Sequence, residues 1–250
     1  MCTLEKVALI GIMTVLPLSA WGAEEQKPQN KGAAVQVVAA PVVATPAKVV
    51  YKPPLRGTPA GRVGGGTRGA TERESFSLLV LAPDHIGYTV REQPCLYWYI
   101  SKPTTLPVEV TVIERNGVKP ALEKVIKGPE KGGIQSVCLA DHGVTLRRDA
   151  QYKWFVTLVT DADQRSKDIL AGGIISRIEP TPVLTAKLRG DAAGLAASAV
   201  YAEEGFWYDA LETISRLIDA APDNVELRKQ RATLLEQVGL AETTKLENLQ

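Results

Sequence analysis

The sequence has few of the residues from which metal and redox centres are built. Of its 250 residues only 2 are histidine and 3 are cysteine, so a multi-histidine metal centre is excluded. The formal net charge of +1 lacks the basic excess that is typical of nucleic-acid-binding proteins. Apolar residues make up 45% of the chain and charged residues 23%, which is the profile of a folded protein and argues against wholesale disorder.

Long apolar runs are also missing, except near the start of the chain. Residues 7–18 are almost continuously apolar, Lys6 precedes them, and Ala20-Trp21-Gly22 places small residues at both positions that matter for cleavage. The run is short of the roughly 20 apolar residues that span a bilayer. We expect residues 1–23 to be a signal peptide of a periplasmic or secreted protein, with a short uncleaved anchor as the alternative. We expect no integral membrane segment after cleavage.

Export would leave Cys95 and Cys138 in an oxidising compartment, where thiols tend to pair. In its predicted strand, each cysteine lies on the face opposite the aliphatic residues, which are Leu96 in the first strand and Val137 in the second. The cysteines could therefore bridge neighbouring strands of one sheet, but they could not cross a sandwich core. A disulfide and two unpaired thiols are both compatible with this pattern.

Low-complexity sequence follows the predicted signal peptide. Residues 24–52 are rich in Ala, Val, Pro, Lys and Gln and lack the periodicity of a strand or a helix. Such a segment buries too little apolar surface to offset its ordering entropy, so we expect a disordered tether. Residues 53–70 are a Gly/Arg/Pro-rich motif that is too specific in pattern for a spacer.

The Gly/Arg/Pro-rich motif matches G-x-G-x-x-G over residues 64–69. A dinucleotide site needs this pattern between a buried strand and a helix, whereas a strand is predicted to follow here, so we expect a structural role and no cofactor. Arg56, Arg62 and Arg68 are spaced six residues apart. They could contact an anionic polysaccharide or an acidic partner, or they could bond carbonyls and carboxylates of their own domain.

Residues 71–182 have the signals of an antiparallel Ig-like β-sandwich, because short apolar runs alternate with turn residues. A closed barrel is the lesser option. Asn116-Gly117 between two runs predicts a type I′ hairpin turn. We expect strands over residues 76–81, 88–90, 96–100, 108–114, 118–126, 134–139, 152–160 and 169–178.

Residues 183–250 change to helical periodicity, and we expect about three helices. One should begin at a capping box formed by Asp223 and Glu226 and end at Gly239. Gly239 lies 34 residues after Gly205, which is the tetratricopeptide period, and the pattern resembles one and a half such units. A lone helical hairpin gives a similar pattern.

An aspartate–histidine pair, a loop and an aromatic strand could each be a functional site, and each also has a structural interpretation. Asp84-His85 lies beside no nucleophile, so we expect a turn and no catalytic site. The loop at residues 161–168 suits an Asx-type turn better than a calcium site, and Arg165 within it could pair with an acid of the helical segment. Strand alternation places Trp98 inside and its neighbours Tyr97 and Tyr99 outside.

Four blocks of the sequence together resemble a known family. They are residues 56–69, residues 97–99, a third block comprising residues 152–155, 163–168 and 172–178, and residues 201–211. In combination they resemble the bacterial family called domain of unknown function nine-two-eight, whose members are exported. The resemblance implies the fold and export, and it implies no activity.

We therefore expect an exported, non-enzymatic interaction protein that uses no metal or cofactor and binds a protein in the cell envelope or outside it. Trp207 and Tyr208 are expected to line either the partner contact or the seam between the two parts of the chain. The alternative is a module that binds an envelope polysaccharide through the Arg/Gly-rich loop and the tyrosines.

Overall fold

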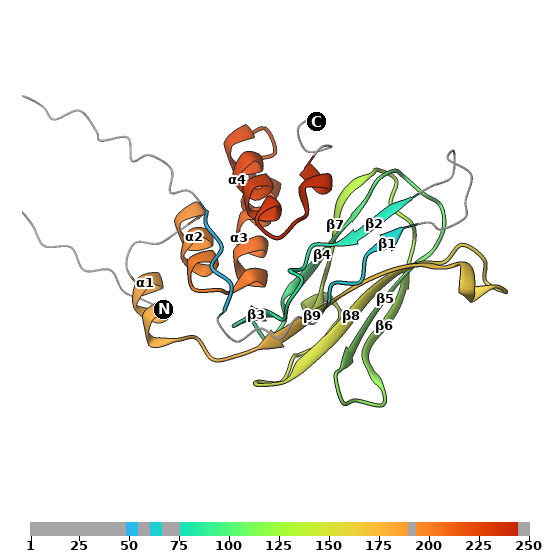
Figure 1. The fold of residues 1–250 in the computed structure, drawn as a ribbon, viewed down its shortest axis with the longest axis horizontal. Helices are drawn as coiled ribbons and strands as arrows, with labels where there is room; N and C mark the ends of the chain where they lie inside the picture. The colour runs from blue at the N-terminus through green and yellow to red at the C-terminus, as the bar shows by residue number, and fades with distance from the viewer. Residues whose placement is uncertain (1–48, 55–60, 67–75, 190–193, 245–250) are drawn as a thin grey trace, which may run out of the picture. The chain divides into compact units, whose positions relative to one another are not determined.

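Two β-sheets and a C-terminal group of α-helices make up the fold (Figure 1). The computed structural model describes residues 49–54, 61–66, 76–189 and 194–244. They belong to the compact unit that runs from Ala44 to Gln250. The predicted signal peptide, residues 1–23, lies outside the described residues, as does the predicted tether up to residue 48.

The first sheet has the strand order β1-β2-β4-β7 and is antiparallel. Its strands are β1 (Gly65–Gly66), β2 (Ser77–Val80), β4 (Cys95–Ile100) and β7 (Gly133–Cys138). All six residues of β4 are buried, which means that both faces of this strand are covered. The predicted outward position of Tyr97 and Tyr99 is wrong, because the helices cover the face that carries them and each is only 6% exposed.

The second sheet has the order β3-β9-β8-β5-β6, in which only β3 and β9 run parallel. Alternating apolar residues such as Val108, Val110 and Val112 face the core. The strands are β3 (Gly87–Thr89), β5 (Val108–Glu114), β6 (Pro120–Ile126), β8 (Gln151–Leu158) and β9 (Ile169–Arg177).

The β5–β6 hairpin forms as predicted, but its turn is not type I′. Neither Asn116 nor Gly117 has a positive φ. The Gly117 amide instead donates to the Glu114 carbonyl oxygen at 2.8 Å, which places Gly117 last in the turn, and β6 begins three residues later at Pro120. The extra loop residues relieve the twist constraint that makes two-residue hairpins adopt type I′.

The C-terminal part contains four α-helices within the described residues, and α1 was not predicted. They are α1 (Pro182–Arg189), α2 (Leu195–Glu203), α3 (Trp207–Ala220) and α4 (Val225–Glu236). Asn224 caps α4, since its side chain accepts from the amides of Glu226 and Leu227, so the predicted cap at Asp223 is one residue too early. Short 3₁₀ turns η1 (Leu139–His142), η2 (Arg165–Lys167) and η3 (Ala241–Thr244) complete the elements.

Residues 49–54 form an extended strap along the helices, visible as the blue segment beside α2 (Figure 1). The Gln237 side chain accepts from the Tyr51 amide at 2.8 Å and donates to the Val49 carbonyl oxygen at 3.1 Å. The Lys52 amide donates to the Ala202 carbonyl oxygen at 3.0 Å. The predicted tether therefore extends too far, because Val49 and Tyr51 are buried and held by hydrogen bonds.

One hydrophobic core runs from the two sheets into the helices without interruption. It joins Trp98 and Trp154 of the sheets to Trp207 and Leu211 of α3. The helices thus cover the outer face of β4 and pack as part of the same core.

Candidate functional site

Two aromatic residues at the start of α3 hold the helices against the sheets. The Trp207 indole Nε1 donates to the Leu81 carbonyl oxygen at 2.9 Å. The Tyr208 hydroxyl donates to the Ile174 carbonyl oxygen at 3.1 Å and accepts from Trp154 Nε1 at 2.9 Å. Both aromatic side chains are buried, so the structure places them in the seam and leaves neither accessible to a partner.

Two buried carboxylates on α3 bind the backbone that enters β4. Asp209 Oδ2 accepts from the Val90 amide and Glu212 Oε2 accepts from the Cys95 amide, each at 3.0 Å. Arg91 Nε lies 3.4 Å from Asp209 and 3.6 Å from Glu212. Burial raises the pKa of Asp209 to about 7, although Arg91 and the Val90 amide act in the opposite direction. Since neither carboxylate has exposed surface, both serve to dock α3.

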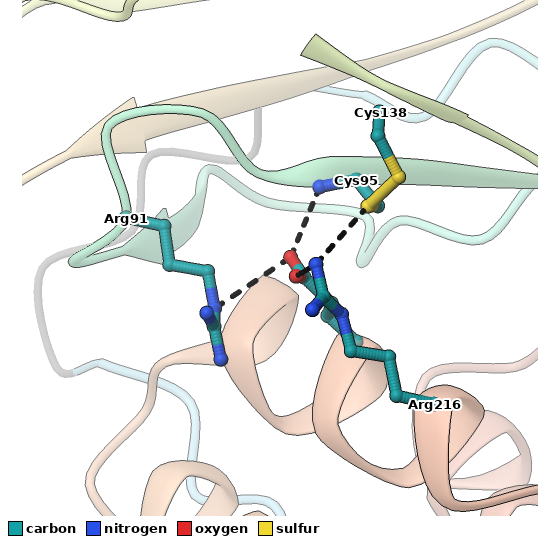
Figure 2. The surroundings of a disulfide bond; sticks show 5 residues. Arg91, Cys95, Cys138 and Arg216 are labelled. Atoms are coloured by element: carbon teal, nitrogen blue, oxygen red, sulfur yellow. Dashed lines mark hydrogen bonds and ion pairs between the residues drawn. A yellow bond between two sulfur atoms is a disulfide. The ribbon is translucent and has the colours of Figure 1, made fainter. Parts of the chain in front are cut away.

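A disulfide lies beside Glu212, whose carboxylate accepts from the Cys95 amide (Figure 2). It joins Cys95 of β4 to Cys138 of β7, which are register partners on neighbouring strands of one sheet. Arg91 and Arg216 approach the Glu212 carboxylate from two sides, with Arg216 Nη2 at 2.7 Å. Arg216 Nη2 is also 3.8 Å from the Cys95 sulfur. The disulfide therefore fixes β7 to the sheet at the point where α3 docks.

A polar cleft of about 270 Å³ opens between β7 and the helices α3 and α4. Its lining includes three cationic side chains and a single acidic one. The lining residues are Tyr97, Lys131, Gly132, Gly133, Ile134, Gln135, Ser136, Ile218, Asp219, Arg228, Arg231 and Thr243. A cleft with this charge balance favours an anionic ligand.

The cations of the cleft differ in burial. Lys131 is exposed at the start of β7, and Arg228 is half-buried on α4. Arg231 is buried one helical turn further along α4 and donates to the Ser215 hydroxyl at 3.2 Å. Within the described part of the chain, neither Lys131 nor Arg228 forms an ion pair. The cleft therefore combines an ordered buried cation with two cations that can meet a ligand.

The predicted arginines of the Gly/Arg/Pro-rich motif can be followed only in part. Arg62 donates to the carbonyl oxygens of Ala82 at 3.0 Å and Val238 at 3.1 Å. These bonds tie the motif to the end of α4 and agree with the structural interpretation for this residue. Arg56 and Arg68 lie outside the described residues.

Arg165 does not pair with the helical segment. Its guanidinium contacts Glu109 of β5 at 2.9 Å and Asp168 at 2.5 Å, so the hypothesis that it docks the helices is wrong. The expected Asx-type turn is present in the same loop, where the Asp163 amide donates to Asp161 Oδ1 at 3.0 Å. Docking is carried out instead by the carboxylates of α3.

The described residues contain no group of three or more His, Cys, Asp or Glu side chains that could hold a metal ion. Among the same residues, no helix combines the length and apolarity that crossing a membrane requires. His85 lies in an isolated β-bridge after a bend at Asp84, and not in the predicted turn; its Nδ1 lies 3.1 Å from the Ile86 carbonyl oxygen, and its ring stacks on Tyr51 at 5.9 Å.

The family model of DUF928, Domain of Unknown Function, matches residues 63–247. The chain belongs to this family. A search of curated proteins found no match. The match covers both sheets and the four α-helices that the structure describes in this DUF928 chain.

Sequence reasoning missed the docking carboxylates and the cleft of this DUF928 chain. A signal for the carboxylates was present, because Asp209 and Glu212 interrupt the apolar face of α3 that also carries Ile214. Acids on the buried side of an amphipathic helix need partners, and they therefore mark a docking point. No comparable signal existed for the cleft, because Lys131 and Arg228 are 97 positions apart in the sequence.

Proposed function

We propose that this DUF928 chain is an exported, non-enzymatic interaction protein whose partner binds in the cleft between β7 and the helices. The observation that carries the proposal is the cleft itself, whose described lining residues include the cations Lys131, Arg228 and Arg231 and one acid, Asp219. The sandwich acts as the scaffold, and the helical segment supplies one wall of the binding surface.

Both walls of the cleft are held rigidly, which suits a recognition surface. On one side the Cys95–Cys138 disulfide fixes β7 to β4. On the other side the ion pair between Arg216 and the buried Glu212 carboxylate and the Arg231–Ser215 hydrogen bond fix the helices. Preorganised walls reduce the ordering cost of binding.

Two observations support export to the periplasm or the cell exterior. The apolar run near the start of the chain is typical of a signal peptide. The structure contains a disulfide between Cys95 and Cys138, and disulfides persist mainly in oxidising compartments.

The finer description of the fold is also part of the proposal. The strand order, with β4 and β7 in one sheet and β5, β8 and β9 in the other, supports an Ig-like sandwich. Gly205 and Gly239 follow α2 and α4 with φ of +83° and +73°, and their amides donate to the carbonyl oxygens of Ala202 and Glu236. This equivalence at a spacing of 34 residues supports a tetratricopeptide-like unit.

An anionic polysaccharide is the second candidate ligand, because the cations of the cleft would attract it equally. The two tyrosines expected to bind it, Tyr97 and Tyr99, are largely buried, and Arg62 is engaged within the protein. These observations favour a protein partner.

Site-specific photo-crosslinking tests the proposal in cells that export the full chain. A photoreactive amino acid at Ser136, which is exposed in the cleft, should give one discrete protein adduct. The same amino acid at Val118, which is 94% exposed outside the cleft, is the matched control and should give none. The adduct should disappear when Arg228→Glu is added. Equal adducts at both sites, or an adduct insensitive to Arg228→Glu, would contradict the proposal.

A further inference from the structure

The open edge of β7 runs along the cleft. Among the described residues, β7 ends its sheet and pairs only with β4. An edge strand presents a row of unpaired N–H and C=O groups that can bind a further strand. Ile134, Gln135 and Ser136 of this edge strand line the cleft, so a strand added to β7 would run beside the charged side chains of the cleft.

The cations of the cleft come from both of its walls. Lys131 lies just before β7, whereas Arg228 and Arg231 lie three residues apart on one face of α4. Ile134 and Ile218 also line the cleft. This set of cations fits an extended peptide in which acidic and apolar residues alternate, because alternation places all of its carboxylates on one face of the strand.

We propose that β7 binds an extended acidic segment of a partner protein as an additional strand, with its carboxylates directed at Lys131 and Arg228. The inference rests on the proposed function and names the partner chemistry of the same cleft. Main-chain hydrogen bonds along β7 supply affinity, and the cations select acidic sequences over others.

The size of the cleft agrees with this occupant. A volume of about 270 Å³ lies just below the range of pockets that enclose a small-molecule ligand, which begins at roughly 300 Å³. The cleft can therefore receive a few side chains of a segment whose main chain lies along the edge. A free small anion would leave the backbone groups of β7 unused.

A fluorescein-labelled octapeptide of alternating Glu and Val tests the inference by fluorescence anisotropy on the full chain. We expect saturable binding that Arg228→Glu weakens at least tenfold. Lys124→Glu makes the same charge change on the exposed face of β6 and should leave the affinity unchanged. Thermal melts of both variants establish that they are folded.

A second probe separates strand addition from simple charge attraction. The same octapeptide with N-methyl groups on alternate residues keeps every charge but loses the amide donors of one edge. Methylation is placed on either alternating set in turn, and one of the two peptides should bind at least tenfold more weakly. Equal binding by both methylated peptides, or equal binding by a polyuronate of matched charge, would overturn the inference.

Two further results separate the possible failures. If the octapeptide does not bind while Arg228→Glu still abolishes the Ser136 crosslink, the partner surface is correct and the strand proposal is wrong. If neither occurs, the proposed function fails as well. Removal of residues 245–250, which follow η3 in the sequence, should not change the affinity. A tenfold increase would assign the cleft to the chain's own C-terminus.

Discussion

At the scale of single residues, the Tyr208 hydroxyl connects α3 to two strands of the second sheet. It bonds to Trp154 of β8 and to Ile174 of β9. Tyr208→Phe would leave the Trp154 N–H and the Ile174 carbonyl oxygen without this partner. Unsatisfied buried polar groups cost about 1–3 kcal/mol each, so we expect the free energy of unfolding to fall by at least that amount. Urea denaturation measures it. Tyr88→Phe, at a hydroxyl with no hydrogen bond among the described residues, should have little effect.

The ring of Tyr208 also requires glycine at position 87. A Cβ at Gly87 would lie 2.5 Å from Tyr208 Cε2, and the two hydrogen bonds of Tyr208 prevent the ring from moving aside. Gly87→Ala should therefore destabilise the protein by about 1–3 kcal/mol, the usual cost of overpacking. Gly64→Ala is the control, because no atom lies within 4 Å of its added Cβ. Equal melting temperatures for the two variants would refute this prediction.

Asp209 should make stability depend on pH in an unusual direction for a carboxylate. Its pKa is about 7 when folded and about 3.9 when unfolded, so between these values the folded state binds more protons. Stability should therefore fall as the pH rises from about 4 to 7. The charged or titratable groups around it are Arg91, Glu212 and Tyr201.

The measurement is the free energy of unfolding of the wild type relative to Asp209→Asn, taken from pH 4 to pH 8. The asparagine keeps an oxygen that can accept from the Val90 amide, and it carries no titrating proton. The wild type should lose stability relative to the variant as the pH increases. A difference that stays constant or rises with pH would show that Asp209 is ionised throughout this range.

At the scale of elements, the strap depends on side chains from the far end of the chain. Gln237→Ala removes the bonds to the Tyr51 amide and the Val49 carbonyl oxygen. We expect faster hydrogen exchange at the Tyr51 amide, with little change at amides in β8, because the strap can open locally. Gln164→Ala, at an exposed glutamine in another loop, is the control and should leave exchange unchanged. Unaltered exchange in Gln237→Ala would show that burial of Tyr51 alone holds the strap.

At the scale of the whole molecule, the sheets depend on the helices. A chain ending at Pro182 would expose the faces of Leu81, Tyr97 and Tyr99 that the helices and the strap now cover. We expect such a chain to lose its cooperative unfolding transition and to bind a hydrophobic dye. A chain that lacks only residues 245–250 should unfold cooperatively. Retention of a sharp transition in the shorter chain would show that the two sheets fold without the helices.

Local sequence patterns predicted most of the individual strands and helices, but they predicted little of how these elements pack together. Alternation in residues 108–114 and the 3.6-residue period around Leu211 and Ile214 identified elements that the structure confirms. The same alternation misplaced Tyr97 and Tyr99, because it distinguishes the two faces of a strand without showing that a helix covers the second face. The cleft was missed because it depends on contacts between distant segments.

The strap has a consequence for the order in which the protein matures. The Val49 amide bonds to the Gln230 side chain, 181 positions later, so residues 49–54 can reach their final place only after almost all of the polypeptide has been synthesised. Closure of such distant contacts is slow. Until then the rings of Trp207 and Tyr51, which pack against each other in the folded protein, lack this contact. Chaperones bind apolar surface of this kind on incompletely folded chains.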